Sequence, residues 1–401
     1  MGAPAARVSE LAREWVAQGH LVTVLTGFPN HPNGKVPKEY KWKLWRLTIT
    51  EKYYGVRVVR TWLAPFANRH WWERVLNYVS FCLSASARSI CLQRHDVVIA
   101  TSPQLLQGIV GLVLKYLKRT PFVFEVRDLW PESLQAVGTS SSDSMLMKSL
   151  GAIAGSLYKR SDRIVVVTPR FMSHLVQCWG IPGEKIRVVV NGIDVDFLAT
   201  GAEFDARRAY GLGGCFVVSF VGTIGNAHGL ETLVETARLM ANQTRIRFLV
   251  VGDGAERKKL VELVAESGLR NIQIEEPQPR TRVPAILRAS DVCLVLLKRS
   301  PVFETVIPTK MLEFMAAGRP VIVAVEGQAA EIMRAARGGL CISPESPEQL
   351  KQAIEYMVDH AEEAARFGEM GRDYVMRNFS RRETAQLYLD ILQEVSNLRP
   401  R

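Results

Sequence analysis

Short apolar, β-branched runs alternate with amphipathic stretches of helical length along most of the chain, and this alternation constrains the fold most. Runs of this kind are typical of buried strands. Strands separated by helices form parallel βαβ units, because each crossover returns the chain to the same edge of the sheet. We therefore predict a doubly wound α/β fold with strands at 21–26, 56–59, 96–101, 122–126, 163–167, 186–190, 216–221, 247–251, 272–274, 292–297 and 321–325.

The pattern loosens over residues 196–207 and then restarts, which predicts two Rossmann-like domains in series. A chain of 401 residues also exceeds what a single hydrophobic core usually supports. The final stretch, 349–398, has a helical pattern with breaks expected near Gly368 and at Phe379-Ser380. We expect an N-terminal domain at 1–195, a C-terminal domain at 196–375, and a helix at 376–401 that packs back on the N-terminal domain.

The beginning of the pattern is irregular. A doubly wound domain normally opens with a strand, whereas Gly2-Ala3-Pro4 leads straight into an amphipathic helix at Ala5–Ala17. The Gly-Ala-Pro turn looks like the loop that should follow such a strand. We therefore expect that the first strand is missing, through truncation or a misplaced start codon. The alternative is a domain that begins with a helix.

The composition is that of an ordinary globular protein, with 47% hydrophobic and 23% charged residues. The six cysteines show no C-x-x-C spacing, so they predict small core residues in a reducing compartment rather than disulfides or a metal site. No apolar run is long enough to predict a transmembrane helix, and the N-terminus does not resemble a cleavable signal peptide.

Positive charge is concentrated in one window, residues 35–94, which holds twelve Lys or Arg and three Glu. This window therefore supplies most of the chain's net charge of +11. The same window holds five of the eight tryptophans, Trp42, Trp45, Trp62, Trp71 and Trp72. This combination suits an anionic membrane surface, where indole rings lie at the level of the headgroups. It would also suit single-stranded nucleic acid, or a solvated basic face with half-buried indoles. We favour the membrane surface and expect no nucleic-acid partner.

One short predicted helix carries a lysine and a carboxylate near its beginning. Thr309 can cap it, and Gly318 fits the left-handed residue that ends it. Lys310 and Glu313 are three residues apart and share a face. A cation and a carboxylate at a helix N-terminus suit a ligand with both phosphate and vicinal hydroxyls, as in a nucleotide sugar. The alternative is an ordinary surface ion pair.

Glycine-rich turns follow several predicted strands, where ligands of open α/β sheets bind. The run Gly222–Gly229 connects a strand to a helix, so its backbone can approach a diphosphate and the helix N-terminus offers free N–H groups. Asn226 and His228 would add side-chain donors, and Lys298 follows a later strand. Glycine after a strand is also ordinary turn chemistry. No Asp-x-Asp pair occurs in a metal-binding context, so we predict no metal site.

Together these motifs resemble those of glycosyltransferase family four. The subgroup they resemble most is that of the N-acetyl-fucosamine transferases of O-antigen, capsule and lipopolysaccharide assembly. The motifs are Gly2-Ala3-Pro4-Ala5-Ala6-Arg7, Gly19-His20, Arg127-Asp128-Leu129-Trp130-Pro131-Glu132, Asn191-Gly192-Ile193-Asp194, Gly222–Leu230, Gly252-Asp253-Gly254 and Pro308-Thr309-Lys310-x-x-Glu313 with Gly318-Arg319-Pro320. The resemblance implies the GT-B fold, in which two Rossmann-like domains face each other across a cleft, with the acceptor on the first and the nucleotide sugar on the second. It also implies retention of the anomeric configuration.

The resemblance assigns roles to individual residues of the second domain. Glu313 matches the second glutamate of the family's E-x7-E motif, which holds the ribose hydroxyls. The first glutamate should fall at Thr305, and Glu304 is one place out, so the sugar-binding role does not transfer to it. Many relatives bind the diphosphate through an Arg and a Lys in the glycine loop, and Lys310 is the natural substitute here.

In the first domain, many relatives place a histidine where Arg127-Asp128 stands. A general-base or sugar-positioning role would then fall on Asp128 or Glu132. The alternative for both carboxylates is helix capping and ion pairing around Arg127.

The predicted reaction is transfer of an N-acetylated deoxyhexose from a UDP-linked donor to a lipid-linked glycan, at the cytoplasmic face of the membrane. The enzyme would be of the hexosyl or N-acetylhexosaminyl type, peripheral on the membrane through residues 35–94, and without metal or cofactor. Two alternatives stay open, a nucleotide-sugar epimerase of similar architecture and an inactive, truncated sugar-nucleotide binder. The residues expected around the donor are Gly222, Gly225, Asn226, His228, Lys298, Pro308, Thr309, Lys310 and Glu313.

Overall fold

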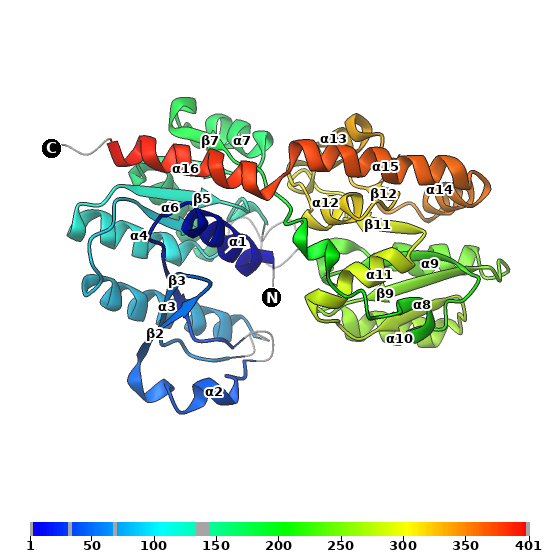
Figure 1. Cartoon of the computed structure of the whole chain (residues 1–401), viewed down its shortest axis with the longest axis horizontal. Helices are drawn as coiled ribbons and strands as arrows, with labels where there is room; N and C mark the ends of the chain where they lie inside the picture. Colours follow the sequence, from blue (N-terminus) through cyan, green and yellow to red (C-terminus); the bar gives the residue numbers. More distant parts are fainter. Residues whose placement is uncertain (1–2, 31–33, 67–69, 134–144, 398–401) are drawn as a thin grey trace. The chain divides into compact units, whose positions relative to one another are not determined.

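The computed structural model describes residues 3–30, 34–66, 70–133 and 145–397 (Figure 1). The described chain divides into two compact units. The N-terminal unit contains the residues up to Val190 together with those from Thr384 onward, and the C-terminal unit is Asn191–Glu383. Gly2, residues 67–69 of the basic window and residues 398–401 of the expected C-terminal helix lie outside the described residues.

The C-terminal unit is built on one parallel six-stranded sheet. Its strand order is β10-β9-β8-β11-β12-β13, and every neighbouring pair is parallel. The order reverses between β8 and β11, which is the switch point where doubly wound sheets bind ligands. The strands are β8 (Phe216–Val221), β9 (Ile246–Val251), β10 (Ile272–Glu275), β11 (Val292–Leu296), β12 (Val321–Ala324) and β13 (Gly339–Cys341).

Helices cover both faces of this sheet, because its central strands are apolar on both sides. β11 and β12 are buried at every residue. On one face Phe220 and Leu294 pack with Leu233 and Ile354 of the flanking helices. The helices are α8 (Ala206–Ala209), α9 (Glu231–Leu239), α10 (Arg257–Ser267), α11 (Val283–Ala289), α12 (Thr309–Ala316), α13 (Gln328–Ala336), α14 (Pro347–Asp359) and α15 (Ala361–Asn378), with short 3₁₀ turns η3 (Asp196–Ala199), η4 (Asn226–His228), η5 (Arg280–Arg282) and η6 (Phe303–Thr305).

Among its described residues, the N-terminal unit contains two separate sheets. One has the order β1-β3-β2, with β1 parallel and β2 antiparallel to β3, and the other is the parallel sheet β4-β5-β6-β7. The strands are β1 (Thr23–Gly27), β2 (Thr48–Tyr53), β3 (Val56–Thr61), β4 (Val98–Thr101), β5 (Phe122–Val126), β6 (Arg163–Val166) and β7 (Ile186–Val188). The helices are α1 (Ala3–Ala17), α2 (Lys38–Lys41), α3 (Trp71–Ile90), α4 (Leu105–Lys118), α6 (Met145–Arg160), α7 (Pro169–Trp179) and α16 (Arg381–Asn397), with η1 (Leu44–Arg46) and η2 (Gly183–Lys185).

The last helix, α16, completes the core of the N-terminal unit. Tyr388 packs edge-on against Trp15 of α1, with their ring centroids 5.5 Å apart. The Trp15 indole N–H donates to the carbonyl of Ala385 at 2.9 Å. Tyr388 and Leu389 belong to the same buried cluster as Val123 of β5. Helices α1 and α16, blue and red in Figure 1, therefore cover one face of this unit together.

The predicted doubly wound architecture is confirmed, whereas the elements β2, α2, α8, α13 and β13 escaped the pattern. β2 has no apolar run and is exposed or half-buried throughout, and α13 and β13 follow β12 without a clear break. The expected helix break near Gly368 is wrong, because α15 runs through it and the interruption falls at His360. Gly368 instead lies against the carbonyl of Gly318 so closely that a Cβ atom would overlap it.

Within the described residues, each helix is either too short or too polar to cross a bilayer.

We predict that Gly368→Ala destabilises the C-terminal unit by about 1–3 kcal/mol, although alanine is the better helix former. The added methyl group would overlap the Gly318 carbonyl, which is backbone and cannot rotate away. All eight tryptophans lie in the N-terminal unit, so tryptophan fluorescence would not report on unfolding of the C-terminal unit. Hydrogen exchange of β8 and β11, which belong to the C-terminal unit, is therefore the measurement. The exposed neighbour Glu369→Ala is the control and should change stability by less than about 0.5 kcal/mol. Equal stability of the two variants would contradict the close packing at Gly368.

Candidate functional site

A glycine loop follows β8 at the switch point of the C-terminal sheet. Gly222 has a φ of 139° and Gly229 a φ of 55°, both values that favour glycine. The loop is fixed from below by the turn after β9, since Ile224 N donates to the Asp253 carbonyl at 2.9 Å. A Cβ atom on Gly252 would overlap the Gly222 carbonyl. The backbone of this loop is therefore held in place by a second glycine turn.

Lys310 lies directly under this loop. A Cβ atom built on Gly222 would be 3.4 Å from the Lys310 Nζ. The Nζ lies 4.0 Å from the ring centroid of Phe220, out of contact with solvent, and has no hydrogen-bond partner among the described residues. Burial lowers the pKa of the Lys310 amine to about 7, although Glu313 opposes this shift. The site thus contains an enclosed amine with unused donors.

His228 lies beside this amine on the same loop. Its ring packs edge-on against Phe220, with the centroids 5.6 Å apart, and its Nδ1 lies 3.3 Å from the Gly225 carbonyl. Burial, and then repulsion from Lys310, lower the pKa of His228 to about 3. His228 is therefore neutral at pH 7, and positive charge at this point comes from Lys310.

Glu313 is paired with an arginine from another loop rather than with Lys310. The Arg280 Nη1 lies 3.0 Å from the Glu313 Oε1. The Arg280 guanidinium also lies over the ring of Phe197, 4.0 Å from its centroid. No Lys310–Glu313 ion pair occurs, so the surface ion pair that the sequence left open is not formed. Arg280 is a site residue that sequence reasoning missed, because no local signal links it to Glu313, which lies 33 positions later.

The structure confirms the residue expected after the C-terminal end of α12 and corrects the cap expected at its N-terminal end. The expected Thr309 cap is wrong: Thr309 is the first helical residue, and Pro308 occupies the N-cap position without a side-chain hydrogen bond. Proline is compatible with this position because the first N–H groups of a helix have no partner inside it. Gly318 does adopt the left-handed conformation, with a φ of 70°. The first turn of α12 therefore keeps its N–H groups without a side-chain cap.

Asn226 and Lys298 contact each other on the outer side of the glycine loop. The Lys298 Nζ donates to the Asn226 Oδ1 at 2.6 Å, and its backbone N–H donates to the Ala227 carbonyl at 2.9 Å. Its side chain also packs on Gly229. Lys298 thereby links the loop after β11 to the loop after β8.

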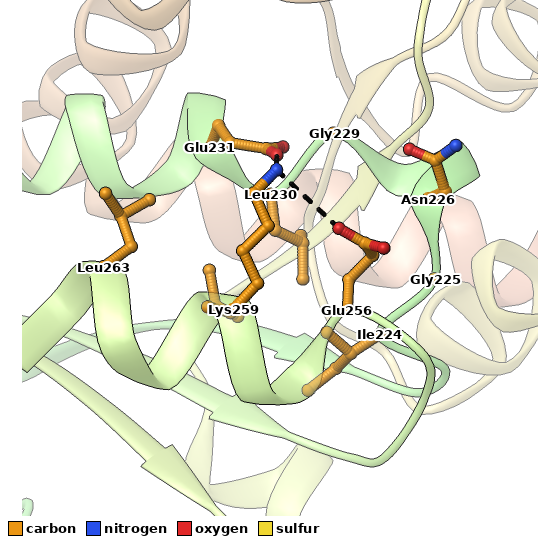
Figure 2. A pocket seen from close by; sticks show the side chains of 10 residues that line it. Ile224, Gly225, Asn226, Gly229, Leu230, Glu231, Glu256, Lys259 and Leu263 are labelled. Carbon is orange, nitrogen blue, oxygen red and sulfur yellow. Dashed lines mark hydrogen bonds and ion pairs between the residues drawn. The ribbon is translucent and has the colours of Figure 1, made fainter. Parts of the chain in front are cut away.

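A small pocket lies on the other side of this loop, between the beginnings of α9 and α10 (Figure 2). Figure 2 shows the Lys259 amine between the carboxylates of Glu231 and Glu256, at 2.8 and 3.7 Å. The pocket volume of about 20 Å³ admits little more than one water molecule. It is therefore a crevice behind the loop rather than a nucleotide site.

Glu304 packs at the beginning of α13. It belongs to η6, and its main chain and Cβ pack against Gly327 at the beginning of α13. Gly327 has a φ of 73°, so it also requires glycine on conformational grounds. The structure thus places Glu304 beside α13 rather than on α12 next to Glu313.

The N-terminal unit has a second polar cluster at the carboxyl ends of β4 and β5. The Ser102 Oγ accepts hydrogen bonds from the backbone N–H groups of Arg127 and Asp128, at 2.8 and 3.3 Å. Burial raises the pKa of the Asp128 carboxyl to about 6, although Arg127 acts against it. Asp128 is thus an ionised carboxylate at neutral pH that still accepts a proton readily.

Glu132 is held in a different network. The Trp179 indole N–H donates to its Oε1 at 3.1 Å, and the His174 Nε2 lies 3.1 Å from the same oxygen. Burial alone would raise the pKa of Glu132, but these contacts outweigh it and the pKa is lowered. Glu132 is therefore engaged by His174 and Trp179.

A buried ion pair that the sequence did not reveal lies under the same cluster. The Arg7 Nη2 and Glu125 Oε1 are 2.9 Å apart, and both side chains are almost fully buried. Arg7 also donates to the carbonyls of Val189 and Val190, and Thr101 donates to the other oxygen of Glu125 at 2.6 Å. The two partners are 118 positions apart, so no local pattern could have paired them.

In the described part of the chain, no group of three or more His, Cys, Asp or Glu side chains is arranged to hold a metal ion.

Both units match families of known proteins. Residues 2–192 match the family described as glycosyl transferase 4-like domain, and residues 205–374 match glycosyl transferases group 1. A curated relative is the putative colanic acid biosynthesis glycosyl transferase WcaI of Escherichia coli K12, which is 25% identical over 365 residues, covering 85% of each chain.

Solved structures share the fold. Sucrose-phosphate synthase from Thermosynechococcus elongatus superposes with a TM-score of 0.79 at 20% identity, over 99% of this chain and 94% of that one. Anabaena HepE in complex with UDP-glucose gives a TM-score of 0.69 at 15% identity, over 94% of this chain and 100% of that one. At these identities the likeness establishes the architecture.

We predict that stability of the ligand-free C-terminal unit rises between about pH 7 and pH 10 because of Lys310. Its folded-state pKa of about 7 lies below the ordinary lysine pKa of 10.5, so the unfolded chain binds more protons in this window. Lys310→Met should remove this rise and be more stable than the parent at pH 6, where the burial penalty is fully present. Hydrogen exchange of β8 across pH, corrected for intrinsic exchange, measures it.

The matched control is Lys258→Met, which changes an exposed lysine on α10. It should leave the pH dependence as it is in the parent. A parent protein and a Lys310→Met variant with parallel pH profiles would show that the amine is solvated in the ligand-free protein.

Proposed function

Because this chain is a glycosyltransferase of the GT-B fold, we propose that its C-terminal unit binds the nucleotide diphosphate of a sugar donor at the switch point between β8 and β11. The observation that carries this proposal is the enclosed Lys310 amine under Gly222, which has no hydrogen-bond partner among the described residues. A buried amine without a partner is costly, and a bound anion would remove that cost.

The diphosphate would contact Lys310 and the backbone of the glycine loop. The absence of a side chain at Gly222 leaves room directly above the Lys310 Nζ. Gly225 begins the short turn that leads to α9, and α12 contributes its first N–H groups at Thr309, so the dipoles of both helices favour an anion. Binding would raise the pKa of Lys310 and take up a proton near neutral pH.

The ribose would be held by Glu313, oriented by Arg280. The Glu313 Oε1 is taken by Arg280, while its other oxygen is free of any bond that the structure records within the described residues. A carboxylate fixed by one charged hydrogen bond presents its second oxygen in a defined direction. Arg280 is therefore a positioning residue, itself fixed by Phe197.

Catalysis would come from stabilising the departing diphosphate. In front-face transfer with retention, the C1–O bond to phosphate breaks as the glycosidic bond forms. The acceptor hydroxyl proton passes to a phosphate oxygen, so no protein nucleophile is required. Lys310 and the loop N–H groups would stabilise the charge that develops on the leaving oxygen.

Two carboxylates of the N-terminal unit, Asp128 and Glu132, are candidates for a role with the acceptor. Asp128 is the better candidate, because Glu132 is engaged by His174 and Trp179.

The relatives and the resemblance support one class of donor and one class of acceptor. HepE binds UDP-glucose, and WcaI is named for colanic acid biosynthesis. We accordingly propose a UDP-linked N-acetylated deoxyhexose as donor and a lipid-linked glycan of a cell-surface polysaccharide as acceptor, as in the N-acetyl-fucosamine transferase-like subgroup.

A lipid-linked acceptor would require the enzyme to lie at a membrane surface, and one face of the N-terminal unit is suited to it. Trp42 and Trp45 are exposed beside Lys43 and Arg46, whose charged groups lie 5.2–5.8 Å from the indole rings. Further exposed apolar side chains form a stripe along α3, at Trp72, Val75, Leu76, Val79 and Leu83. We propose peripheral binding of this face to anionic lipid.

We predict that UDP raises the thermal unfolding midpoint of the C-terminal unit and that Glu313→Ala weakens UDP binding at least about 10-fold, or about 1.4 kcal/mol. Glu313→Ala should weaken the binding of uridine monophosphate by the same factor, since the ribose contact is common to both ligands. Lys310→Met should weaken UDP more than uridine. Isothermal titration calorimetry measures these affinities. Proton uptake on UDP binding appears as a dependence of the measured binding enthalpy on the ionisation enthalpy of the buffer.

The control is Glu266→Ala, an exposed glutamate on α10 that should bind UDP like the parent. Parent-like affinity in both site variants would remove the site assignment. Release of a free epimer from UDP-sugar alone, seen by NMR, would instead favour the epimerase.

We predict that the protein sediments with vesicles of mixed phosphatidylserine and phosphatidylcholine and less with pure phosphatidylcholine. Replacing Lys41, Lys43 and Arg46 by Gln should weaken binding by about 3 kcal/mol, since each cation near an anionic surface contributes about 1 kcal/mol. The charge-matched control replaces exposed Lys258, Arg366 and Arg377 of the C-terminal unit. Equal losses in both triple variants would mean that net charge, and not this face, drives binding.

A further inference from the structure

A groove with a volume of about 270 Å³ lies between α4 and α6 on the surface of the N-terminal unit. Both helices contribute to its lining, which consists of Ile109, Leu112, Ala152, Ile153, Ser156 and Leu157. Apart from the Ser156 hydroxyl, these side chains are apolar. Ala152 is nevertheless exposed, so the groove opens to solvent. An apolar hollow at the surface is typical of a binding site.

Two contacts hold α4 and α6 together beneath and beyond the groove. A Cβ atom on Gly108 of α4 would overlap the end of the Leu157 side chain, so the helices touch there. At the C-terminal end of α4, the Lys115 Nζ donates to the Arg160 carbonyl and to the Asp162 carboxylate, each at 2.7 Å. The two helices are therefore fixed relative to each other, and the groove is a feature of the packed unit.

The groove runs away from the sheet edge that carries Asp128. α4 follows β4 directly, and α6 ends beside Asp162, whose backbone N–H donates to the Phe122 carbonyl at the beginning of β5. Both helices thus begin at the carboxyl edge of the parallel sheet and end at its opposite edge. Ser102 and Asp128 lie at the carboxyl edge. The N-terminal end of the groove is therefore at the same edge as Asp128.

Lys148 supplies positive charge at this end of the groove. It lies one turn before Ala152 on α6, and residues four apart share a face of a helix. Its side chain is exposed, and the first turn of α6 contains no acidic residue. An apolar groove with a cation at one end suits an amphipathic ligand that has an anionic head.

A single hydrocarbon chain suits this groove better than a protein segment does. An α-helix with its side chains is about 10 Å wide, whereas this volume lies just below the range of about 300–1,000 Å³ that is typical of ligand pockets. An extended peptide would place polar backbone groups against apolar walls, which is costly. A hydrocarbon chain needs no hydrogen bond and gains free energy for each CH₂ group that it buries.

We propose that this groove binds the hydrocarbon chain of the lipid-linked acceptor, with the anionic head next to Lys148. The proposal rests on the proposed function, in which the acceptor is lipid-linked. α3 carries the exposed stripe assigned to the membrane surface, and it packs on α4 through Phe81 and Val110. The groove therefore lies on helices next to the face from which a lipid chain would enter.

The first test varies the length of the chain. The probes are octyl, decyl and dodecyl phosphate, each below its micelle-forming concentration and without vesicles. Calorimetry should show affinity for the full chain rising about 4-fold per added methylene. Methyl NMR should show shifts at Ile109, Leu112 and Ile153. Affinity that does not depend on chain length, or shifts confined to α3, would overturn the proposal.

The second test fills the groove. Ala152→Trp adds a large side chain at an exposed position, so it should weaken decyl phosphate at least about 10-fold while the protein stays folded. The matched control is Ala17→Trp, at an exposed alanine that ends α1, which should bind decyl phosphate like the parent. UDP affinity is measured in the same samples and should be unchanged. Decyl phosphate affinity equal in all three proteins, with UDP binding intact, would overturn this proposal and leave the donor site standing.

The third test identifies the head and the source of the chain. Lys148→Gln should weaken octyl phosphate about 3-fold and leave neutral octyl glucoside unchanged. Dihexanoyl phosphatidic acid has as many chain carbons as dodecyl phosphate but should bind at least about 10-fold more weakly, because the groove admits one chain. Equal affinity would assign the groove to membrane lipid, and a dimer that Ala152→Trp dissociates in sedimentation would assign it to a second copy. Either result would overturn the proposal.

Discussion

The placement of one buried amine organises the C-terminal unit. Lys310 reaches its position because α12 begins directly after Pro308 and points its first turn at the loop beyond β8. Its burial lowers its own pKa and helps to keep His228 neutral. The φ of 139° at Gly222, beside the amine, favours glycine. The ligand-free protein therefore carries a local destabilisation that an anion would relieve, which is a common property of binding sites.

The sequence was sufficient for the fold class because strand and helix signals in doubly wound units are strong and local. β5 and β8 begin and end at the residues that the pattern predicts. It was also sufficient to bring Gly222, His228 and Lys310 together, since strands of a parallel sheet end at one edge. What it could not supply were partners set by tertiary packing. Arg280 reaches Glu313, and Arg7 reaches Glu125, across distances in sequence that carry no periodic signal.

Errors in the prediction share a physical origin. Thr309 and Gly368 were both interpreted from local propensity, a cap for threonine and a break for glycine. In the structure Thr309 lies inside the helix, and Gly368 serves close backbone packing with Gly318. Propensity is a weak preference that packing overrides. Glu132, which the resemblance makes a candidate for acceptor chemistry, is bound by His174 and Trp179, partners that tertiary packing supplies.

The return of α16 to the N-terminal unit has a consequence for biosynthesis. Tyr388, Leu389 and Val395 are buried in the same cluster as Val123 and Val165, yet they leave the ribosome only after the whole C-terminal unit has been made. Domains generally fold as units in the order of their synthesis. Here the first unit to be synthesised would be the last to complete its core, and its exposed apolar surface would need protection in the interval.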